Sequence, residues 1–377
     1  MNKNKNHSPL SNIRVLDFTN MLSGPYCTRL LADMGAEVIK IEPKTGDHNR
    51  HRRPLRSGHS SFFGHLNSGK KSVVLDLKTE KGKSAALWLV KKCDVMVENW
   101  RPGVAARLGL CYDQVSKLNP RLIVCAISGF GQEGPDSQRP AFAPIVHAAS
   151  GFDLANVAYQ GGGKPLKSAA YVADVLGGMS AFAAIQTALL NRHNTNQGQF
   201  IDVSLMDCML NLMINEVQDA QFPTDEKLRV YQPLMTRDGY IMIAPTSQRN
   251  FEQLADTLNR KNWLTDDRFS TLSVRETYWT EFMEEIEKCT LKYSSIDCET
   301  LLLNAGIPCS RYKTVAEAIN DPQTIVRGTL RSISDEVGSY KVPNAPFKMP
   351  GLDTHIREHV PRLGEHENEI LKDFKDD

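Results

Sequence analysis

Short apolar runs alternate with helix-like stretches through the first third of the chain. The run IRVLDF (13–18) is followed by the helical pattern YCTRLLADMG, which Gly35 closes, and then by a second run, AEVIKIE (36–42). This strand, helix and strand have the length typical of a parallel crossover. Similar runs recur downstream with helical stretches between them (71–77, 94–100, 121–131). The sequence therefore predicts an α/β fold, a doubly wound, Rossmann-like parallel sheet with its ligand at the carboxyl ends of the strands.

The length of the chain, 377 residues, favours two domains, because a single core usually stops growing at roughly 250–300 residues. From about residue 222 the pattern changes to an Asp-Gly turn leading into a strand, charged amphipathic helices, and a further strand in GIPCSRYKT. A tail rich in Pro and Gly follows, of the kind that packs back on a neighbouring domain. We predict a large α/β domain, 1–215, completed by the tail 331–377, and a smaller α+β domain, 222–330.

The charge balance gives no sign of a nucleic-acid or anionic-membrane binder, since 45 Lys and Arg face 44 Asp and Glu. The eight cysteines are scattered, with no Cys-x-x-Cys pair, which favours a reducing cytoplasm over a disulfide framework or a zinc site. The polar start, MNKNKNHSPLSN, lacks the apolar stretch of a secretory signal. We therefore expect a cytoplasmic protein with no metal, nucleic-acid or membrane partner.

The usual phosphate-binding fingerprints are missing from this predicted sheet. TNMLSGP follows the first strand where a dinucleotide-binding protein has Gly-x-Gly-x-x-Gly, and no P-loop motif occurs. Nicotinamide, flavin and P-loop nucleotide chemistry are therefore disfavoured.

A long apolar segment, YVADVLGGMSAFAAIQTALL (171–190), carries one charge, Asp174. Its Gln, Ser, Thr and Ala content favours a buried helix of a soluble protein over a membrane span. Asp174 stands where an N-cap or first-turn residue would, so a capping role is one interpretation. The other is a partly desolvated, reactive carboxylate, because Gly177 and Gly178 would let a bulky ligand approach the backbone. A carboxylate is a weak nucleophile, so its substrate would have to be activated already, as a thioester is.

Several motifs in register resemble the class III CoA-transferases, which include formyl-CoA transferase, the carnitine CoA-transferases and the related α-methylacyl-CoA racemases. They are VLDFTNMLSGPYCTRLLADMGAEVIKIEP, NSGKKSVVLDLKTEKGK, DVMVENWRPGVAARLGL, NPRLIVCAISGFGQEGP and YVADVLGGMSA. The resemblance covers residues 10 to 210 and resumes at TRDGYIMIA and GIPCSRYKT. It implies that Asp174 is the nucleophile, that CoA binds as the acyl-CoA substrate, and that an aspartyl-CoA thioester forms on the way to a second carboxylic acid.

The resemblance also implies which residues contact CoA: Leu22, Ser23, Leu75, Asp76, Leu77, Lys78, Asn99, Trp100, Arg101, Arg107, Arg139, Pro140, Ala141 and Phe142. Of these, Lys78, Arg101 and Arg107 are the cations expected at the CoA phosphates. Many transferases have Gln at the position of Leu22 and at that of His147, so acyl handling can differ here. The acyl group is expected near His147, Tyr171, Gly177 and Gly178.

Two alternatives to CoA transfer remain open. Racemisation needs an acid and a base on opposite faces of the substrate, and the family's racemases supply a His in a Gly-His-Asp context. This chain has Phe142 at that place, and only a catalytic His147 would restore the chemistry. A catalytically silent CoA-binding homologue is the second alternative. The resemblance also implies an interlocked homodimer, while donor and acceptor acids are not readable from the sequence.

Overall fold

The structure is a computed structural model that describes residues 7–223 and 230–375. The first six residues of the polar start, on which the expectation about a secretory signal rests, lie outside that description. Two compact units make up the chain. The large unit comprises Met1–Val217 with Ile325–Asp377, and the small unit is Gln218–Thr324.

The large unit is built on a six-stranded sheet in which every strand pairs in parallel. Its strands are β1 (Arg14–Asp17), β2 (Glu37–Glu42), β5 (Lys71–Val74), β6 (Val95–Glu98), β7 (Ile123–Ser128) and β8 (Phe200–Ser204). Their order is β5-β2-β1-β6-β7-β8. The chain thus runs outward from β1 to one edge and returns to the other side of β1, so the strand order reverses between β1 and β6. A doubly wound sheet binds ligands at such a reversal, beyond the carboxyl ends of the strands.

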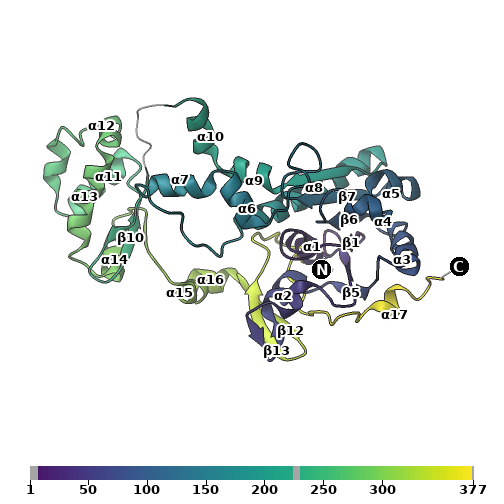
Figure 1. The fold of residues 1–377 in the computed structure, drawn as a ribbon. Helices are drawn as coiled ribbons and strands as arrows, with labels where there is room; N and C mark the ends of the chain where they lie inside the picture. Colours follow the sequence, from purple (N-terminus) through teal and green to yellow (C-terminus); the bar gives the residue numbers. More distant parts are fainter. Residues whose placement is uncertain (1–6, 224–229, 376–377) are drawn as a thin grey trace. The chain divides into compact units, whose positions relative to one another are not determined.

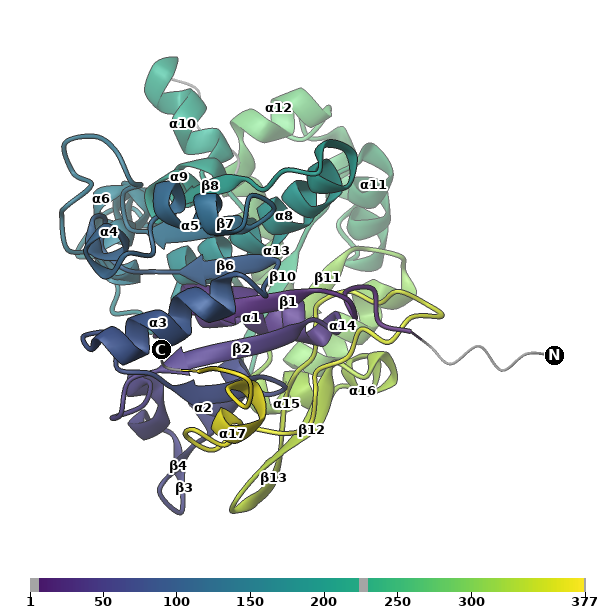
Figure 2. The same cartoon turned by 90° about the vertical axis from the view of Figure 1, so that its right-hand side faces the viewer.

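Helices cover both faces of this sheet, as Figures 1 and 2 show. One face packs on α1 (Ser23–Asp33) and α8 (Val172–Thr195), with Val15 and Val97 in the shared core. The other packs on α3 (Glu80–Val90), α5 (Tyr112–Leu118) and the C-terminal tail, with Leu16 and Met96 pointing that way. Neighbouring residues of one strand enter different cores because strand side chains alternate between faces. The predicted parallel α/β sheet is confirmed.

The apolar segment singled out in the sequence forms α8, a 24-residue helix. In the described residues it alone is long and apolar enough to cross a membrane, by length and composition only. One side of α8 packs on α1 and on the following helix α9 (Leu205–Leu212) and buries Ala181 and Ile185. Another side leaves Met179 and Leu190 exposed. This is the packing of a core helix with one free apolar side.

Shorter elements complete the large unit. They are the 3₁₀ turn His48–His51, β3 (Leu55–Arg56), β4 (His59–Ser60), α2 (Ser61–Asn67), α4 (Val104–Leu108), α6 (Ala143–Ala149), α7 (Phe152–Tyr159), β12 (Leu330–Asp335), β13 (Gly338–Pro343) and α17 (Glu367–Ile370). The tail returns to the large unit, where Phe374 packs on Trp88 at a ring separation of 5.8 Å. The helices α10 (Ile214–Gln221) and α16 (Pro322–Arg327) lie where the chain passes between the units.

The small unit holds a three-stranded antiparallel sheet in the order β11-β10-β9. Its elements are β9 (Leu234–Met235), β10 (Tyr240–Ile243), α11 (Gln248–Thr257), the 3₁₀ turn Lys261–Thr265, α12 (Leu272–Thr277), α13 (Trp279–Thr290), α14 (Ser295–Asn304), β11 (Cys309–Arg311) and α15 (Val315–Ile319). Aromatic side chains around Phe282 fill its core.

Candidate active site

Asp174 lies in the first turn of α8, but it does not cap the helix. Tyr171 is the N-cap residue and makes no capping side-chain bond. The free N–H of Ala173 instead donates to Nε2 of His147, at 3.1 Å. The capping role considered for Asp174 is thus performed, in part, by His147, and the Asp174 carboxylate is left for other contacts.

The Asp174 carboxylate has few partners for a group that is largely removed from water. Burial raises its pKa to about 6, while a side-chain hydrogen bond with Ser23 and the charge of Arg52 act in the opposite direction. Desolvation outweighs both because it disfavours the charged form more than one hydroxyl and a cation at a distance can offset. At neutral pH the group is mostly ionised and poorly solvated, as a nucleophile requires.

Gly178 explains how Ser23 reaches Asp174, and Gly177 permits a second close contact of α8. A Cβ on Gly178 would lie 2.6 Å from the carbonyl oxygen of Ser23, and one on Gly177 would lie 2.3 Å from Cδ2 of Leu205. Both glycines therefore permit close packing of α8 on α1 and α9. The sequence suggested that they leave room for a ligand, whereas in the structure protein atoms fill that space. Their effect on the site is indirect, since the contact at Gly178 brings the first residue of α1 to the first turns of α8.

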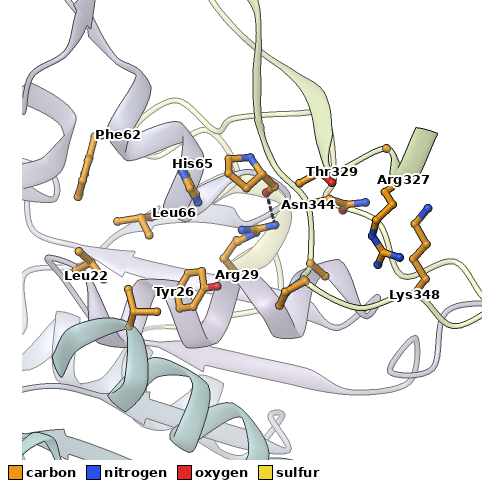
Figure 3. A pocket seen from close by; sticks show the side chains of 15 residues that line it. Leu22, Tyr26, Arg29, Phe62, His65, Leu66, Arg327, Thr329, Asn344 and Lys348 are labelled. Carbon is orange, nitrogen blue, oxygen red and sulfur yellow. Dashed lines mark hydrogen bonds between the residues drawn. The ribbon is translucent and has the colours of Figure 1, made fainter. Parts of the chain in front are cut away.

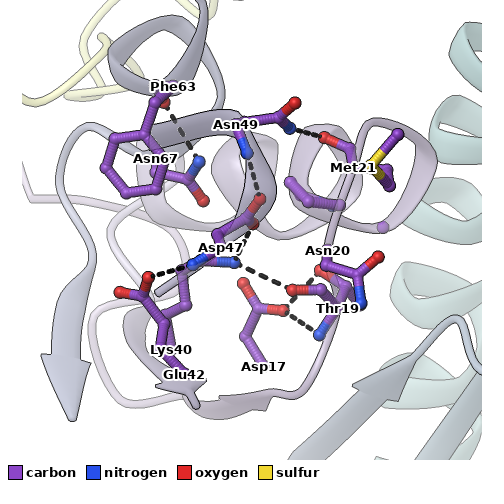
Figure 4. Close-up of polar contacts among 12 residues, drawn as sticks. Asp17, Thr19, Asn20, Met21, Lys40, Glu42, Asp47, Asn49, Phe63 and Asn67 are labelled. Atoms are coloured by element: carbon purple, nitrogen blue, oxygen red, sulfur yellow. Dashed lines mark hydrogen bonds and ion pairs between the residues drawn. The ribbon is translucent and has the colours of Figure 1, made fainter. Parts of the chain in front are cut away.

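The loop between β1 and α1, which ends at Leu22, is held in place by buried polar groups (Figure 4). Lys40 Nζ donates to the carbonyl of Thr19 at 2.8 Å and pairs with Asp47 at 2.9 Å. Asn49 donates from its side chain to the carbonyl of Met21, a residue with φ of 65°. A non-glycine residue in this left-handed region is unfavourable unless the surroundings enforce it. The network thus fixes the loop that precedes Ser23.

A cavity of about 340 Å³ lies at the reversal of strand order, at the carboxyl ends of β1, β2 and β5. Predicted CoA contacts that line it are Leu75, Asp76, Leu77, Lys78 and Trp100. The Trp100 ring packs on Phe18 at 5.2 Å. Lys78, Arg101 and Arg107 are exposed, and none of them forms an ion pair with a residue that the structure describes. Only Lys78 of these three lines the cavity, which therefore combines an apolar wall with one exposed cation and suits a nucleotide with phosphates.

The other predicted CoA contacts lie outside this cavity. Asn99 links the two loops at the reversal, donating to the Asn20 carbonyl at 2.7 Å and accepting from its N–H at 3.0 Å. Arg139, Pro140, Ala141 and Phe142 form the segment before α6, where Arg139 pairs with Asp136. Leu22 lines a different cavity, and Ser23 faces Asp174.

The second cavity, of about 480 Å³, is drawn in Figure 3, and its lining includes Val175, the residue after Asp174. Leu22, Phe62 and Val175 line it, and Arg327 and Lys348 lie together away from Leu22 and Phe62. The wall at Arg29 is structural, because this guanidinium pairs with Asp33 at 2.7 Å and donates to the Pro343 carbonyl at 2.9 Å. The mostly apolar lining is suited to an acyl group.

Arg52 is a site residue that the sequence analysis missed. Its Nη2 donates to the phenol oxygen of Tyr171 at 2.6 Å, and its guanidinium lies 4.2 Å from the ring centre of Phe62 and 5.0 Å from that of Tyr171. The only signal in the sequence is the basic run HNRHRRP (48–54), which gives no indication of which arginine faces Asp174.

One group of side chains in the C-terminal tail could offer three ligand atoms to a metal ion: His359, Glu365 and His366. Each already has a protein partner. His359 Nε2 bonds to Glu365 at 2.9 Å, and His366 Nδ1 accepts the N–H of Ser72 at 3.3 Å. The spacing of cysteines and histidines, on which the expectation of no metal rests, does not indicate this group.

Comparison with known proteins agrees with the α/β fold of the large unit. Residues 10–367 match the model of CoA-transferase family III, so the chain belongs to this family and is a CoA-transferase. It is 34% identical to an acetyl-CoA:oxalate CoA-transferase of Acetobacter aceti, over 98% of this chain and 97% of the relative. It is 31% identical to a succinate–glutarate CoA-transferase of Agrobacterium fabrum, over 97% and 96%.

Solved structures show the same fold. A CAIB/BAIF family protein from Brucella suis is 29% identical and superposes with a TM-score of 0.85, covering 98% of this chain and all (100%) of that one. A hypothetical protein from Mycobacterium tuberculosis is 27% identical, with a TM-score of 0.89 and coverage of 97% and 100%.

Proposed function

We propose that this chain moves CoA from an acyl-CoA to a free carboxylic acid through a covalent aspartyl-CoA thioester on Asp174. The observation that carries the proposal is the state of that carboxylate. It is desolvated, has a pKa raised to about 6, and has a hydroxyl as its hydrogen-bonding partner. A structural carboxylate would be expected to have more partners than this.

The reaction balances without a redox change. Asp174 attacks the thioester carbonyl carbon, the C–S bond breaks, and CoA leaves as a thiolate, giving a mixed anhydride. The thiolate then attacks Cγ of Asp174 and expels the donor acid as a carboxylate, leaving aspartyl-CoA. The incoming carboxylate attacks the same Cγ and releases the thiolate, which takes the new acyl group from the second anhydride. Asp174 ends as a free carboxylate.

The surrounding residues would perform distinct tasks in this sequence. The Ser23 hydroxyl orients the Asp174 carboxylate, and the cavity at Trp100 and Lys78 would hold the CoA nucleotide. Binding energy from this remote handle positions the thioester for attack. The cavity lined by Leu22 and Phe62 would receive the acyl group. The curated relatives are named for oxalate, succinate and glutarate, so we propose small acids as donors and acceptors.

The racemase alternative is disfavoured by the two residues on which it depends. Phe142 has no ionisable group and is 62% exposed. His147 has its Nε2 lone pair engaged by the Ala173 N–H, and burial lowers its pKa. To act as a base through Nε2, His147 would first have to break its hydrogen bond with the Ala173 N–H. Exchange of solvent deuterium into an acyl-CoA substrate would contradict this assignment.

Trapping of the intermediate tests the proposal. The protein is incubated with acetyl-, succinyl- and formyl-CoA, quenched, and the Asp174 peptide is analysed by mass spectrometry for CoA or, after hydroxylamine, a hydroxamate. We expect an adduct in wild type and in Asp113→Asn, which alters an exposed first-turn aspartate of α5. Asp174→Ala should give none and should lose CoA exchange. A wild-type protein with neither adduct nor exchange would be a silent homologue.

We also propose a homodimer, interlocked as the family resemblance implies, in the cytoplasm. The supporting observation is that α8 and the segment after it leave several large apolar side chains exposed: Val175, Met179, Leu190, Leu210, Leu212 and Ile214. Where such side chains gather on one face of a protein, that face is often an interface. Light scattering should give twice the mass of the chain, and Leu190→Glu should lower it. A monomer at micromolar concentration would refute the dimer.

A further inference from the structure

Arg52 differs from the arginines near it in what it contacts. Arg50 pairs with Glu42 at 2.6 Å, and Arg56 pairs with Asp335 at 3.1 Å. Arg52 instead donates to the Tyr171 phenol, and its guanidinium contacts the rings of both Tyr171 and Phe62. Two rings and a hydrogen bond hold its guanidinium in place without neutralising its charge.

No carboxylate neutralises this charge within the described part of the chain. No carboxylate oxygen among residues 7–223 and 230–375 lies within 4.0 Å of an Arg52 nitrogen. Asp174 lies beyond that distance, but the charge of Arg52 still acts to lower its pKa and so favours its ionised form. An ordered, partly buried cation without an anion is suited to a ligand that carries one.

The separation between Arg52 and Asp174 indicates which part of a ligand Arg52 contacts. The reacting carboxyl group must bond to Asp174, so a cation that touched it would also touch Asp174 and hold the nucleophile in an ion pair. The Arg52 nitrogens lie more than 4.0 Å from the Asp174 carboxylate oxygens. It is also linked to the cavity beside Asp174, because Phe62 lines that cavity and Tyr171 precedes Asp174 by one turn. A second carboxylate, a short chain away from the first, fits this position.

We propose that Arg52 is a specificity-determining residue that binds the far carboxylate of a short dicarboxylic acid while the near carboxylate reacts at Asp174. This inference rests on the proposed function for the reaction at Asp174. It adds a preference for dicarboxylates over monocarboxylates of equal length, which the mechanism alone does not require. Succinate, with two methylene groups between its carboxylates, is the simplest probe.

Binding to a protein that cannot react isolates this contact. In Asp174→Ala protein with CoA present, titration calorimetry measures the Kd of succinate and of monomethyl succinate, which has the same chain and one charge fewer. Adding Arg52→Gln should raise the succinate Kd by about 10- to 100-fold, because it removes a charge-assisted hydrogen bond. The monomethyl succinate Kd should change by less than about twofold. Arg52→Lys should restore part of the loss, since it returns the charge without the planar fork.

Arg53→Gln is the matched control, because it removes the same charge from the adjacent, exposed residue. It should bind succinate as the parent does. Equal weakening of both ligands by Arg52→Gln would show that Arg52 acts on the near carboxylate or only on the fold, and would overturn the proposal. Unchanged succinate binding would overturn it as well.

Adduct trapping separates this proposal from the proposed function. Arg52→Gln should still form the Asp174 adduct from acetyl-CoA, which has no second carboxylate, but should lose adduct from succinyl-CoA at limiting concentration. If wild type forms no adduct while succinate still binds through Arg52, the mechanism fails and the dicarboxylate site holds. If adducts form equally from both donors in Arg52→Gln, the site fails and the mechanism holds.

Discussion

Asp17 and Asp174 are both carboxylates of the large unit that are withdrawn from water, yet their surroundings differ. Asp17, at the end of β1, is 0% exposed and accepts hydrogen bonds from Thr19, from Thr28 at 2.7 Å and from Lys70 at 2.9 Å. Burial raises its pKa, but Lys70, Lys40 and the two threonines more than offset this, and the pKa is lowered. Asp174 has Ser23 and the charge of Arg52, and its pKa is raised to about 6.

The difference shows how the same side chain serves two purposes. A fully paired carboxylate is locked, and Asp17 uses its partners to join β1, α1 and the residues before β5. An under-paired carboxylate costs stability and retains reactivity, because its lone pairs are not all engaged. Strain of this kind concentrates at functional sites and is supported by the rest of the fold.

The largest expected effect comes from breaking the pairing of Asp17. Lys70→Met should destabilise the protein by about 3–5 kcal/mol, since it leaves a buried carboxylate without its cation. Urea denaturation measures this difference. Lys167→Met, which removes an exposed lysine, should lie within about 0.5 kcal/mol of wild type. If Lys70→Met destabilised the protein no more than Lys167→Met does, the ion pair would not be needed to hold Asp17.

The opposite change is expected at Asp174. Asp174→Asn should be inactive but more stable than wild type at pH 7.5 by about 2 kcal/mol, because it removes an under-paired charge. The folded pKa of about 6 exceeds the unfolded value, so the native state binds more protons between about pH 4 and 6. Wild-type stability therefore falls as pH rises through this window. Denaturation at several pH values should show the gain disappearing below about pH 4.

The contact between α1 and α8 should respond to a smaller change. Gly178→Ala places a methyl group 2.6 Å from the Ser23 carbonyl and should cost about 1–2 kcal/mol through overpacking. Thermal melting compares it with Gly239→Ala, where a methyl group meets no atom closer than 3.9 Å. Equal melting temperatures would show that the two helices can separate freely.

The smallest expected effect is the loss of the hydroxyl at Asp174. Ser23→Ala removes a bond to the charged form, so it should raise the Asp174 pKa further, by roughly 0.5–1 unit. The acid limb of kcat/KM should move to higher pH by this amount, and Ser23→Thr should leave it in place. An unmoved acid limb in Ser23→Ala would contradict the assignment of this limb to Asp174.

Much of the fold was predictable because it is encoded locally. The short apolar runs and the Gly35 stop predicted β1, α1 and β2, and the alternation downstream predicted the parallel sheet. The position of Asp174 in the first turn of a helix followed from the same patterns, and the transferase family followed from motifs in register. The interlocked dimer and the roles of individual residues stay predictions.

Other features came only from contacts between distant parts of the chain. His147 caps a helix that begins 25 residues later. Position 178 requires a glycine because the carbonyl oxygen of Ser23 in α1 lies against it. Leu22 and Asn99 were assigned to CoA from their motifs. The structure places Leu22 at the cavity beside Asp174 and uses Asn99 to join two loops. Such assignments depend on where a side chain points, which a motif does not state.

The sequence by itself determined the α/β sheet and the family, and it singled out Asp174 as the predicted nucleophile, because periodicity and motifs are properties of neighbouring residues. Tertiary structure alone decided what surrounds that carboxylate. Ser23 and Arg52 lie 151 and 122 positions before Asp174 in the chain, and only the folding of α1 and the segment after β2 against α8 brings them there. The electrostatic character of Asp174 is therefore a property of the packed molecule, since desolvation and charge act through space.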